Sequence, residues 1–139
     1  MPQEKSGPRH RVLIVDDDES TRLLLARLLG TELRVDAQLA GTCEQALRLA
    51  GEHVYDTILL DLIMPGIGGI EVLKKIRAGS PNARTPVIVV SIIGDPAVID
   101  QCTIAGANAY HVKPVRRAEL VAAVKAQLAE HARPKSFAS

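Results

Sequence analysis

Carboxylates follow two of the apolar runs in this sequence. Asp16 and Asp17 come directly after the run that ends at Val15, and Asp61 follows the run that ends at Leu60. If the two runs are neighbouring parallel strands, their carboxyl ends bring at least three carboxylates to one crevice. Such charges repel and raise one another's pKa unless a cation holds them ionised. Because only hard oxygen ligands follow these runs, the sequence predicts a Mg²⁺ site at Asp16, Asp17 and Asp61.

A hydroxyl and an ammonium follow two further apolar runs. Ser91 comes after Val87–Val90, and Lys113 comes after Ala109–Val112. Taken alone, Ser91 is explained by a strand-end hydrogen bond and Lys113 by a solvated surface position. Together with the carboxylates they favour phosphoryl transfer to Asp61, because a lysine and Mg²⁺ neutralise the transferring oxygens and a hydroxyl donates to one of them.

The elements that position these side chains alternate between strands and helices. Unbroken runs rich in Val and Ile predict four strands buried on both faces, and an alternating stretch predicts a half-exposed edge strand. The five predicted strands are Arg11–Val15, Arg34–Leu39, Thr57–Leu60, Val87–Val90 and Ala109–Val112. The predicted helices cover Glu19–Leu29, Cys43–Ala50, about 70–77, a segment that starts at Asp95-Pro96, and a segment carrying Leu120, Val124 and Leu128.

This order is a strand followed by a helix, repeated five times. Right-handed crossovers then put helices on both faces of a mostly parallel sheet. The predicted fold class is α/β, a doubly wound five-stranded parallel sheet of flavodoxin-like order 2-1-3-4-5, or (βα)5. Residues 11–130 are predicted to form the single domain, and residues 1–10 and 131–139 to be disordered tails.

Composition argues against several other functions. The 139 residues suit one domain, and a net charge of +1 without a basic stripe predicts no nucleic-acid partner. No apolar run approaches the ~20 residues of a membrane span, and the stretch from Met1 to Arg11 lacks a signal core, so we predict a cytoplasmic protein without membrane contact. Cys43 and Cys102 lack metal-ligand spacing and are predicted to fill the core or a groove.

Five motifs agree in order and spacing with one family. They are Val15-Asp16-Asp17, Asp61 with Met64-Pro65 and Gly69, Ser91, Gly106-Ala107 with Tyr110, and Lys113-Pro114. From Arg11 to about Ala129 the sequence resembles the receiver domains of two-component response regulators, of the chemotaxis-regulator type. A lone Asp-Asp or Lys-Pro pair would be a weak signal, whereas the ordered set is highly specific.

The resemblance implies a role for each acidic residue. Asp61 is expected to be the phosphoacceptor, an aspartyl phosphate in the phosphorylated protein. Asp17 and Asp61 are expected to ligate Mg²⁺ together with the backbone carbonyl of Ile63. Asp16 is expected to act on the metal through water.

The resemblance also assigns the remaining motifs. Ser91 and Lys113 are expected to hold the phosphoryl oxygens, and the peptide bond before Pro114 is expected to be cis. Tyr110 resembles the family's switch aromatic, which turns inward when Ser91 is drawn toward the phosphoryl group. A strand aromatic that packs on the preceding helix is a compatible explanation of Tyr110.

Three isoleucines depart from the family pattern. Ile92 is bulky where the family usually carries a small residue, and Ile63 and Ile93 cannot orient a water by hydrogen bonding. We therefore expect slow hydrolysis of the phosphoryl group. The alternative is that Ile92 turns into the core beside the strand 87–90 and only packs.

Three functions remain to be compared. The first is a stand-alone signalling module, phosphorylated by a sensor histidine kinase or a histidine phosphotransfer protein. Its output would be the surface of the helix after Pro96, the strand 109–112 and the last helix, presented to an unknown downstream protein, with a phosphorylation-dependent homodimer left open. The start at Met1 and the short ending mildly favour it over the second function, the receiver part of a longer regulator with a DNA-binding or enzymatic output domain.

The third function, a turnover enzyme, is not expected. Aspartate-nucleophile phosphatases of the haloacid-dehalogenase type need a second Asp two residues after the nucleophile, and Ile63 stands there. A nucleotide site is also disfavoured, because the loop after Val15 is rich in Asp and lacks glycine.

Overall fold

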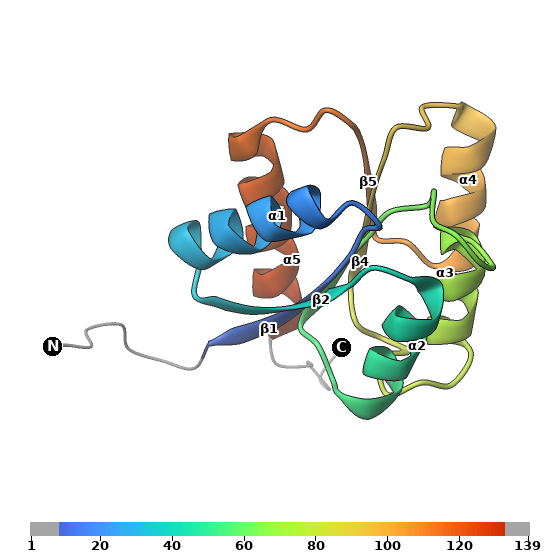
Figure 1. The fold of residues 1–139 in the computed structure, drawn as a ribbon, viewed down its shortest axis with the longest axis horizontal. Helices are drawn as coiled ribbons and strands as arrows, with labels where there is room; N and C mark the ends of the chain where they lie inside the picture. The colour runs from blue at the N-terminus through green and yellow to red at the C-terminus, as the bar shows by residue number, and fades with distance from the viewer. Residues whose placement is uncertain (1–8, 133–139) are drawn as a thin grey trace, which may run out of the picture.

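The computed structural model describes residues 9–132, in which five strands and five helices alternate (Figure 1). The strands are β1 (His10–Val15), β2 (Val35–Ala40), β3 (Thr57–Leu60), β4 (Val87–Ser91) and β5 (Ala109–Val112). The helices are α1 (Glu19–Glu32), α2 (Cys43–Glu52), α3 (Gly69–Arg77), α4 (Pro96–Ala105) and α5 (Arg117–Ala132). The predicted five strand–helix units are confirmed, with bounds that differ by a few residues.

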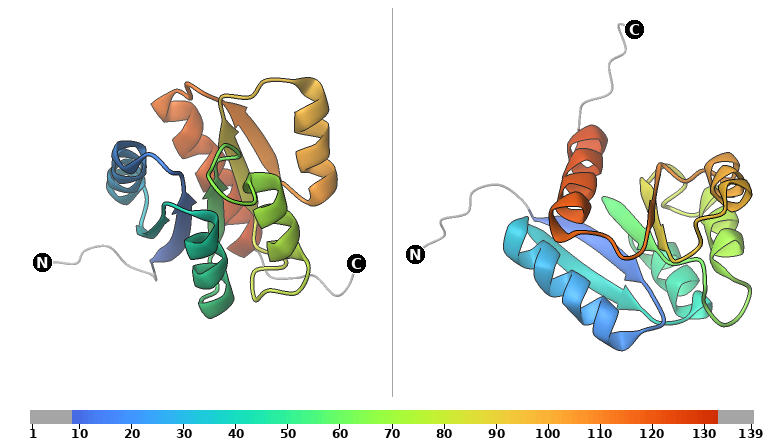
Figure 2. Two further views of the ribbon diagram at one scale, coloured as in Figure 1. Left: turned by 45° about the vertical axis from the view of Figure 1, so that its right-hand side comes forward. Right: turned by 90° about the horizontal axis from the view of Figure 1, so that it is seen from above.

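The strands form one parallel sheet in the order β2-β1-β3-β4-β5, so the predicted fold class is also confirmed. Helices α1 and α5 cover one face of the sheet, and α2, α3 and α4 follow one another across the other face (Figures 1 and 2). Because β1 and β3 pair directly, the residues that follow Val15 and Leu60 lie next to each other.

Both faces of the sheet are buried, as the unbroken apolar runs predict. In β1, Leu13 and Val15 belong to the core cluster under α2, α3 and α4, whereas Val12 and Ile14 belong to the cluster under α1 and α5. The same alternation holds in β3 and β4, because successive side chains of a strand point to opposite faces. The sheet is therefore packed on both faces, and its carboxyl edge presents the polar residues.

Side chains cap the starts of two helices. Asp95 accepts a hydrogen bond from the Ala97 N–H at 2.9 Å, with Pro96 at the first position of α4. At the start of α2, Thr42 accepts a hydrogen bond from the Gln45 N–H at 3.0 Å, and Gln45 Oε1 accepts one from the Gly41 N–H. Among the described residues, no helix is long and apolar enough to cross a bilayer.

The ordered elements reach slightly beyond the predicted domain limits. β1 begins at His10, and Arg9 donates to Asp36 at 2.7 Å, so both residues lie against β2 rather than in a tail. Helix α5 continues to Ala132. The other residues of the two predicted tails, 1–8 and 133–139, lie outside the described part of the chain.

Candidate functional site

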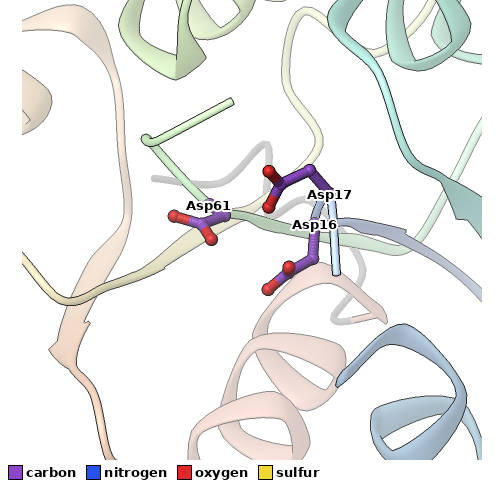
Figure 3. A group of neighbouring side chains, drawn as sticks. All are labelled: Asp16, Asp17 and Asp61. Carbon is purple, nitrogen blue, oxygen red and sulfur yellow. The ribbon is translucent and has the colours of Figure 1, made fainter. Parts of the chain in front are cut away.

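Three carboxylates converge at the carboxyl ends of β1 and β3. One oxygen of each of Asp16, Asp17 and Asp61 lies within 4.8 Å of the other two (Figure 3). Asp16 and Asp61 are 3% and 7% exposed, whereas Asp17 is exposed. Oxygen ligands at this spacing suit a hard divalent cation that keeps several waters. The residues predicted to hold Mg²⁺ are therefore brought together.

Lys113 supplies the positive charge that faces this cluster. Its ammonium donates to Asp16 Oδ2 at 2.9 Å and to Asp61 Oδ2 at 3.0 Å. Burial of the ammonium lowers the pKa of Lys113, but the hydrogen bonds and charges of both carboxylates outweigh it and raise the pKa above its ordinary value. The Lys113–Pro114 peptide bond is cis.

Backbone groups fix the remaining oxygens of the two buried carboxylates. Asp16 Oδ1 accepts from the Asp18 N–H at 2.9 Å, and Asp61 Oδ1 accepts from the Ile63 N–H at 3.1 Å. Each carboxylate thus has one oxygen on Lys113 and one on the backbone. Asp18 stays outside the cluster and caps α1, and hydrogen bonds from Thr21 lower the pKa of Asp18.

Ser91 and Tyr110 are linked through the loop between β4 and α4. The Ile93 N–H donates to Ser91 Oγ at 3.2 Å, and the Tyr110 hydroxyl donates to the Ile93 carbonyl at 2.5 Å. Ser91 is fully buried at the end of β4, and Tyr110 is half-buried against the core under α2, α3 and α4. Burial raises the pKa of the Tyr110 phenol.

Comparison with known proteins decides the family. The family model of the response regulator receiver domain matches residues 12–125 of this chain. The chain belongs to this family. Receiver domains accept a phosphoryl group from histidine kinases and bind Mg²⁺ at their acidic site. They act as signalling switches in two-component systems, so the resemblance inferred from the five motifs is confirmed.

Two curated relatives are much longer than this receiver. The chain is 39% identical over 113 residues to the sensory/regulatory protein RpfC of Xanthomonas campestris pv. campestris, covering 80% of the chain and 15% of that protein. It is 37% identical over 120 residues to the DNA-binding response regulator MtrA of Mycolicibacterium smegmatis, covering 86% of the chain and 51% of that protein. The chain thus spans about half or less of these relatives.

A solved structure shows the same fold. The receiver domain of the sensor histidine kinase PA1611 from Pseudomonas aeruginosa PAO1 superposes with a TM-score of 0.79 at 27% identity, covering 88% of this chain and 99% of that chain. That structure has a magnesium ion coordinated in its active-site cleft.

Arg22 is a residue of the receiver site that the sequence did not reveal. Its guanidinium, on α1, donates to the Asp16 backbone carbonyl at 2.6 Å. It also lies over Gly41, where an added Cβ would come within 2.6 Å of Arg22 Nη1. Arg22 therefore ties the loop that carries Asp16 and Asp17 to the loop after β2. The sequence offered one signal for this contact, because Arg22 lies one turn after the start of α1, close to the loop that carries Asp16 and Asp17.

Two of the departing isoleucines lie at the open side of the receiver site. Ile92 is 66% exposed and does not turn into the core, so the alternative of simple packing beside β4 is wrong. Ile63 is 46% exposed, whereas Ile93 packs partly against the core. Ile92 and Lys113 line a mainly apolar cavity of about 480 Å³ between α1 and the start of α5.

Proposed function

We propose that Asp61 accepts a phosphoryl group from a sensor histidine kinase or a histidine phosphotransfer protein and thereby switches the α4–β5–α5 surface toward a protein partner. The observation that carries this proposal is the pairing of the Asp61 carboxylate with Lys113 at 3.0 Å inside a cluster of three carboxylates. A carboxylate in this setting is held ionised and oriented, as a nucleophile requires.

In the transfer step, an Asp61 oxygen forms a bond to phosphorus while the bond from phosphorus to the donor nitrogen breaks. Asp17 and Asp61, with the Ile63 carbonyl, would hold Mg²⁺, and Asp16 would act through water. Bound Mg²⁺ supplies charge that offsets the negative oxygens of the transferring group. Lys113 then exchanges its bond to Asp61 for a phosphoryl oxygen.

The switch would use the hydrogen bonds that link Ser91 to Tyr110. A phosphoryl oxygen near Asp61 would accept a hydrogen bond from the Ser91 hydroxyl and draw Ser91 Oγ toward itself, away from the Ile93 N–H that now donates to it. The loop then loses its present bond to Ser91, and with it the position in which Ile93 accepts from Tyr110. Phosphorylation can shift this equilibrium only through contacts that differ between the two states, and in the proposed switch these hydrogen bonds are those contacts.

A protein donor would cover the apolar cavity beside Lys113. Leu24, Ile92 and Pro114 line this cavity, and Leu24 and Ile92 are 65% and 66% exposed. A donor histidine has to reach Asp61 from this open side, so its neighbours would contact the same side chains.

A second candidate is the receiver part of a longer regulator with a DNA-binding or enzymatic output domain. The observation in its favour is the length of RpfC and MtrA, of which this chain covers 15% and 51%. The absence of a nucleic-acid partner and the phosphorylation-dependent homodimer remain predictions. The mass of the natural gene product, measured on an immunoblot, distinguishes the stand-alone receiver from the longer regulator.

Phosphoramidate, a small donor with the P–N bond of phosphohistidine, tests the acceptor directly. With Mg²⁺, the wild type should gain the mass of one phosphoryl group, and Asp61→Asn should gain none. Asp18→Asn, which keeps a capping side chain next to the cluster, should be labelled like the wild type. Equal labelling of Asp61→Asn would show that another residue accepts the phosphoryl group.

A further inference from the structure

Helix α4 is held very differently at its two ends. Among its residues only Cys102 is fully buried, and the four residues Gly94–Ala97 at its start are exposed. Its N-terminal end follows the loop in which Ile93 bonds to Ser91 and Tyr110. Its C-terminal end, at the opposite edge of the sheet from Asp61, is enclosed by the side chain of Arg77.

The Arg77 guanidinium makes five hydrogen bonds around this C-terminal end. Nε and Nη2 donate to the Gly106 carbonyl at 3.1 and 2.8 Å, and Nη2 donates to Asn108 Oδ1 at 3.0 Å. Nη1 donates to the carbonyls of Asn82 and Ala83, both at 3.1 Å. A planar fork of this kind fixes several acceptors at once, which a lysine cannot do.

Gly106 is shaped for this contact. It ends α4 in the left-handed region, with φ +113°, and a Cβ there would lie 2.8 Å from Arg77 Nε. The Gly106 backbone therefore lies directly against the Arg77 side chain, and a residue with a Cβ would not fit at position 106.

Arg77 connects this turn to a rigid polar network. Asn82, which is fully buried, donates to the carbonyls of Ala50 and His53 and accepts from the Tyr55 N–H at 2.7 Å. The Thr85 hydroxyl donates to Asn82 Oδ1 at 2.9 Å. The network joins the end of α2, the start of β3 and the loop before β4, so its members cannot move independently.

We propose that Arg77 is a positioning residue for the switch: it anchors the C-terminal end of α4, so that a change at Ser91 and Tyr110 displaces the N-terminal end of the helix about a fixed point. This rests on the proposed function, which places the signal at Asp61. A helix held at one end and lightly packed at the other converts a small shift of a loop into a rotation. Without the anchor, the same shift would be dissipated by movement of the whole helix.

Hydrogen exchange without any phosphoryl mimic tests the anchor first. In Arg77→Met, amides of α4 should exchange at least tenfold faster relative to amides of β1 than in the wild type. Arg77→Lys keeps the charge but loses the fork, and should fall between the two. Arg84→Met, which removes an exposed arginine at the same end of the domain, should leave the ratio unchanged. Equal acceleration of α4 and β1 would mean that Arg77 contributes only global stability, and would overturn the proposal.

Amide chemical shifts with Mg²⁺ and beryllofluoride, a phosphoryl mimic, test the fixed point. In the wild type the shift changes should be large at Ile93 and fall toward Gly106. In Arg77→Met they should be as large at Gly106 as at Ile93, with Arg77→Lys between the two. A variant that keeps the wild-type gradient would refute the anchor. If beryllofluoride moves no amide of the wild type, the proposed function is wrong, and the exchange ratio still decides the role of Arg77.

Discussion

Replacing Asp17 by Asn should have opposite effects on stability in the absence and presence of Mg²⁺. Asp17 is the exposed member of the acidic cluster, and the bonds from Lys113 go to the other two members, Asp16 and Asp61. Its charge therefore adds repulsion to the metal-free protein. Asparagine keeps the shape of the side chain and removes that charge.

The size of the effect follows from the spacing of the carboxylates. Two unit charges 4.8 Å apart repel by about 0.9 kcal/mol in water and about 3.5 kcal/mol at an effective dielectric constant of 20. Since Asp17 is exposed and Lys113 partly compensates the cluster, the lower limit applies. Asp17→Asn should raise the free energy of unfolding in EDTA by about 1 kcal/mol.

Mg²⁺ should reverse this advantage. An ion at ten times its Kd stabilises the native state by about 1.4 kcal/mol, and a variant with a tenfold weaker site gains only about 0.4 kcal/mol at the same concentration. The difference of about 1 kcal/mol cancels the gain from relieved repulsion. The two stability curves should therefore meet near ten times the wild-type Kd and cross above it.

Urea unfolding across a Mg²⁺ titration measures both terms. Asp18→Asn is the matched control, because it removes the same charge one residue away while Asn still caps α1. The control should follow the wild-type dependence on Mg²⁺. Parallel curves for Asp17→Asn and the wild type would show that Asp17 does not ligate the metal, and coincident curves would show in addition that it adds no repulsion to the cluster.

Three further predictions concern the lysine, the switch and the lifetime. Because the folded pKa of Lys113 is raised above its ordinary 10.5, its ion pairs should stabilise the protein at neutral pH and be lost as the pH rises through the raised value. Urea unfolding in EDTA should therefore show a fall of stability above pH about 10.5 that is smaller in Lys113→Met. Ser91→Ala should bind beryllofluoride yet leave the amides of α4 and β5 close to their unliganded shifts, and a full response there would refute the coupling. Ile92→Ala and Ile63→Asn should release phosphate faster at saturating Mg²⁺, each tenfold change corresponding to about 1.4 kcal/mol in the barrier. Unchanged rates in both would show that shielding by these exposed side chains does not set the lifetime.

The sequence predicted the site because the residue types in the strands identify them. Runs of Val and Ile buried on both faces gave four of the five strands, and the strand order then brought Asp16, Asp17 and Asp61 to one edge. No contact between distant residues had to be guessed, since parallel strands align their carboxyl ends. Periodicity predicted the helix ends less well. Helix α1 continues through Gly30 to Glu32, and the Leu33 N–H still donates to the Leu29 carbonyl, although glycine has a low helix propensity.

Polar contacts across long stretches of chain were not predictable. Arg77 and Gly106 are 29 residues apart, and Asn82 reaches Ala50 across 32 residues. Neither pattern nor spacing specifies which carbonyl a lone arginine or asparagine will reach. Similarly, Lys113 was expected to hold phosphoryl oxygens, and only the structure shows that in the unphosphorylated receiver it bonds to two carboxylates instead.

The two ends of the sheet are therefore stabilised by different interactions, ion pairs at one end and hydrogen bonds to backbone carbonyls at the other. At the carboxyl end, Lys113 and the carboxylates form charge pairs. A metal ion or a phosphoryl group bound there would rearrange them, because either one changes the local charge. At the opposite end, Arg77 and Asn82 bond mainly to backbone carbonyls, whose charge no ligand of the site alters. Phosphorylation of Asp61, as proposed, would therefore perturb the first set of bonds and leave the second set in place. Since α4 runs from one end to the other, this asymmetry would determine the direction in which the proposed switch moves the helix.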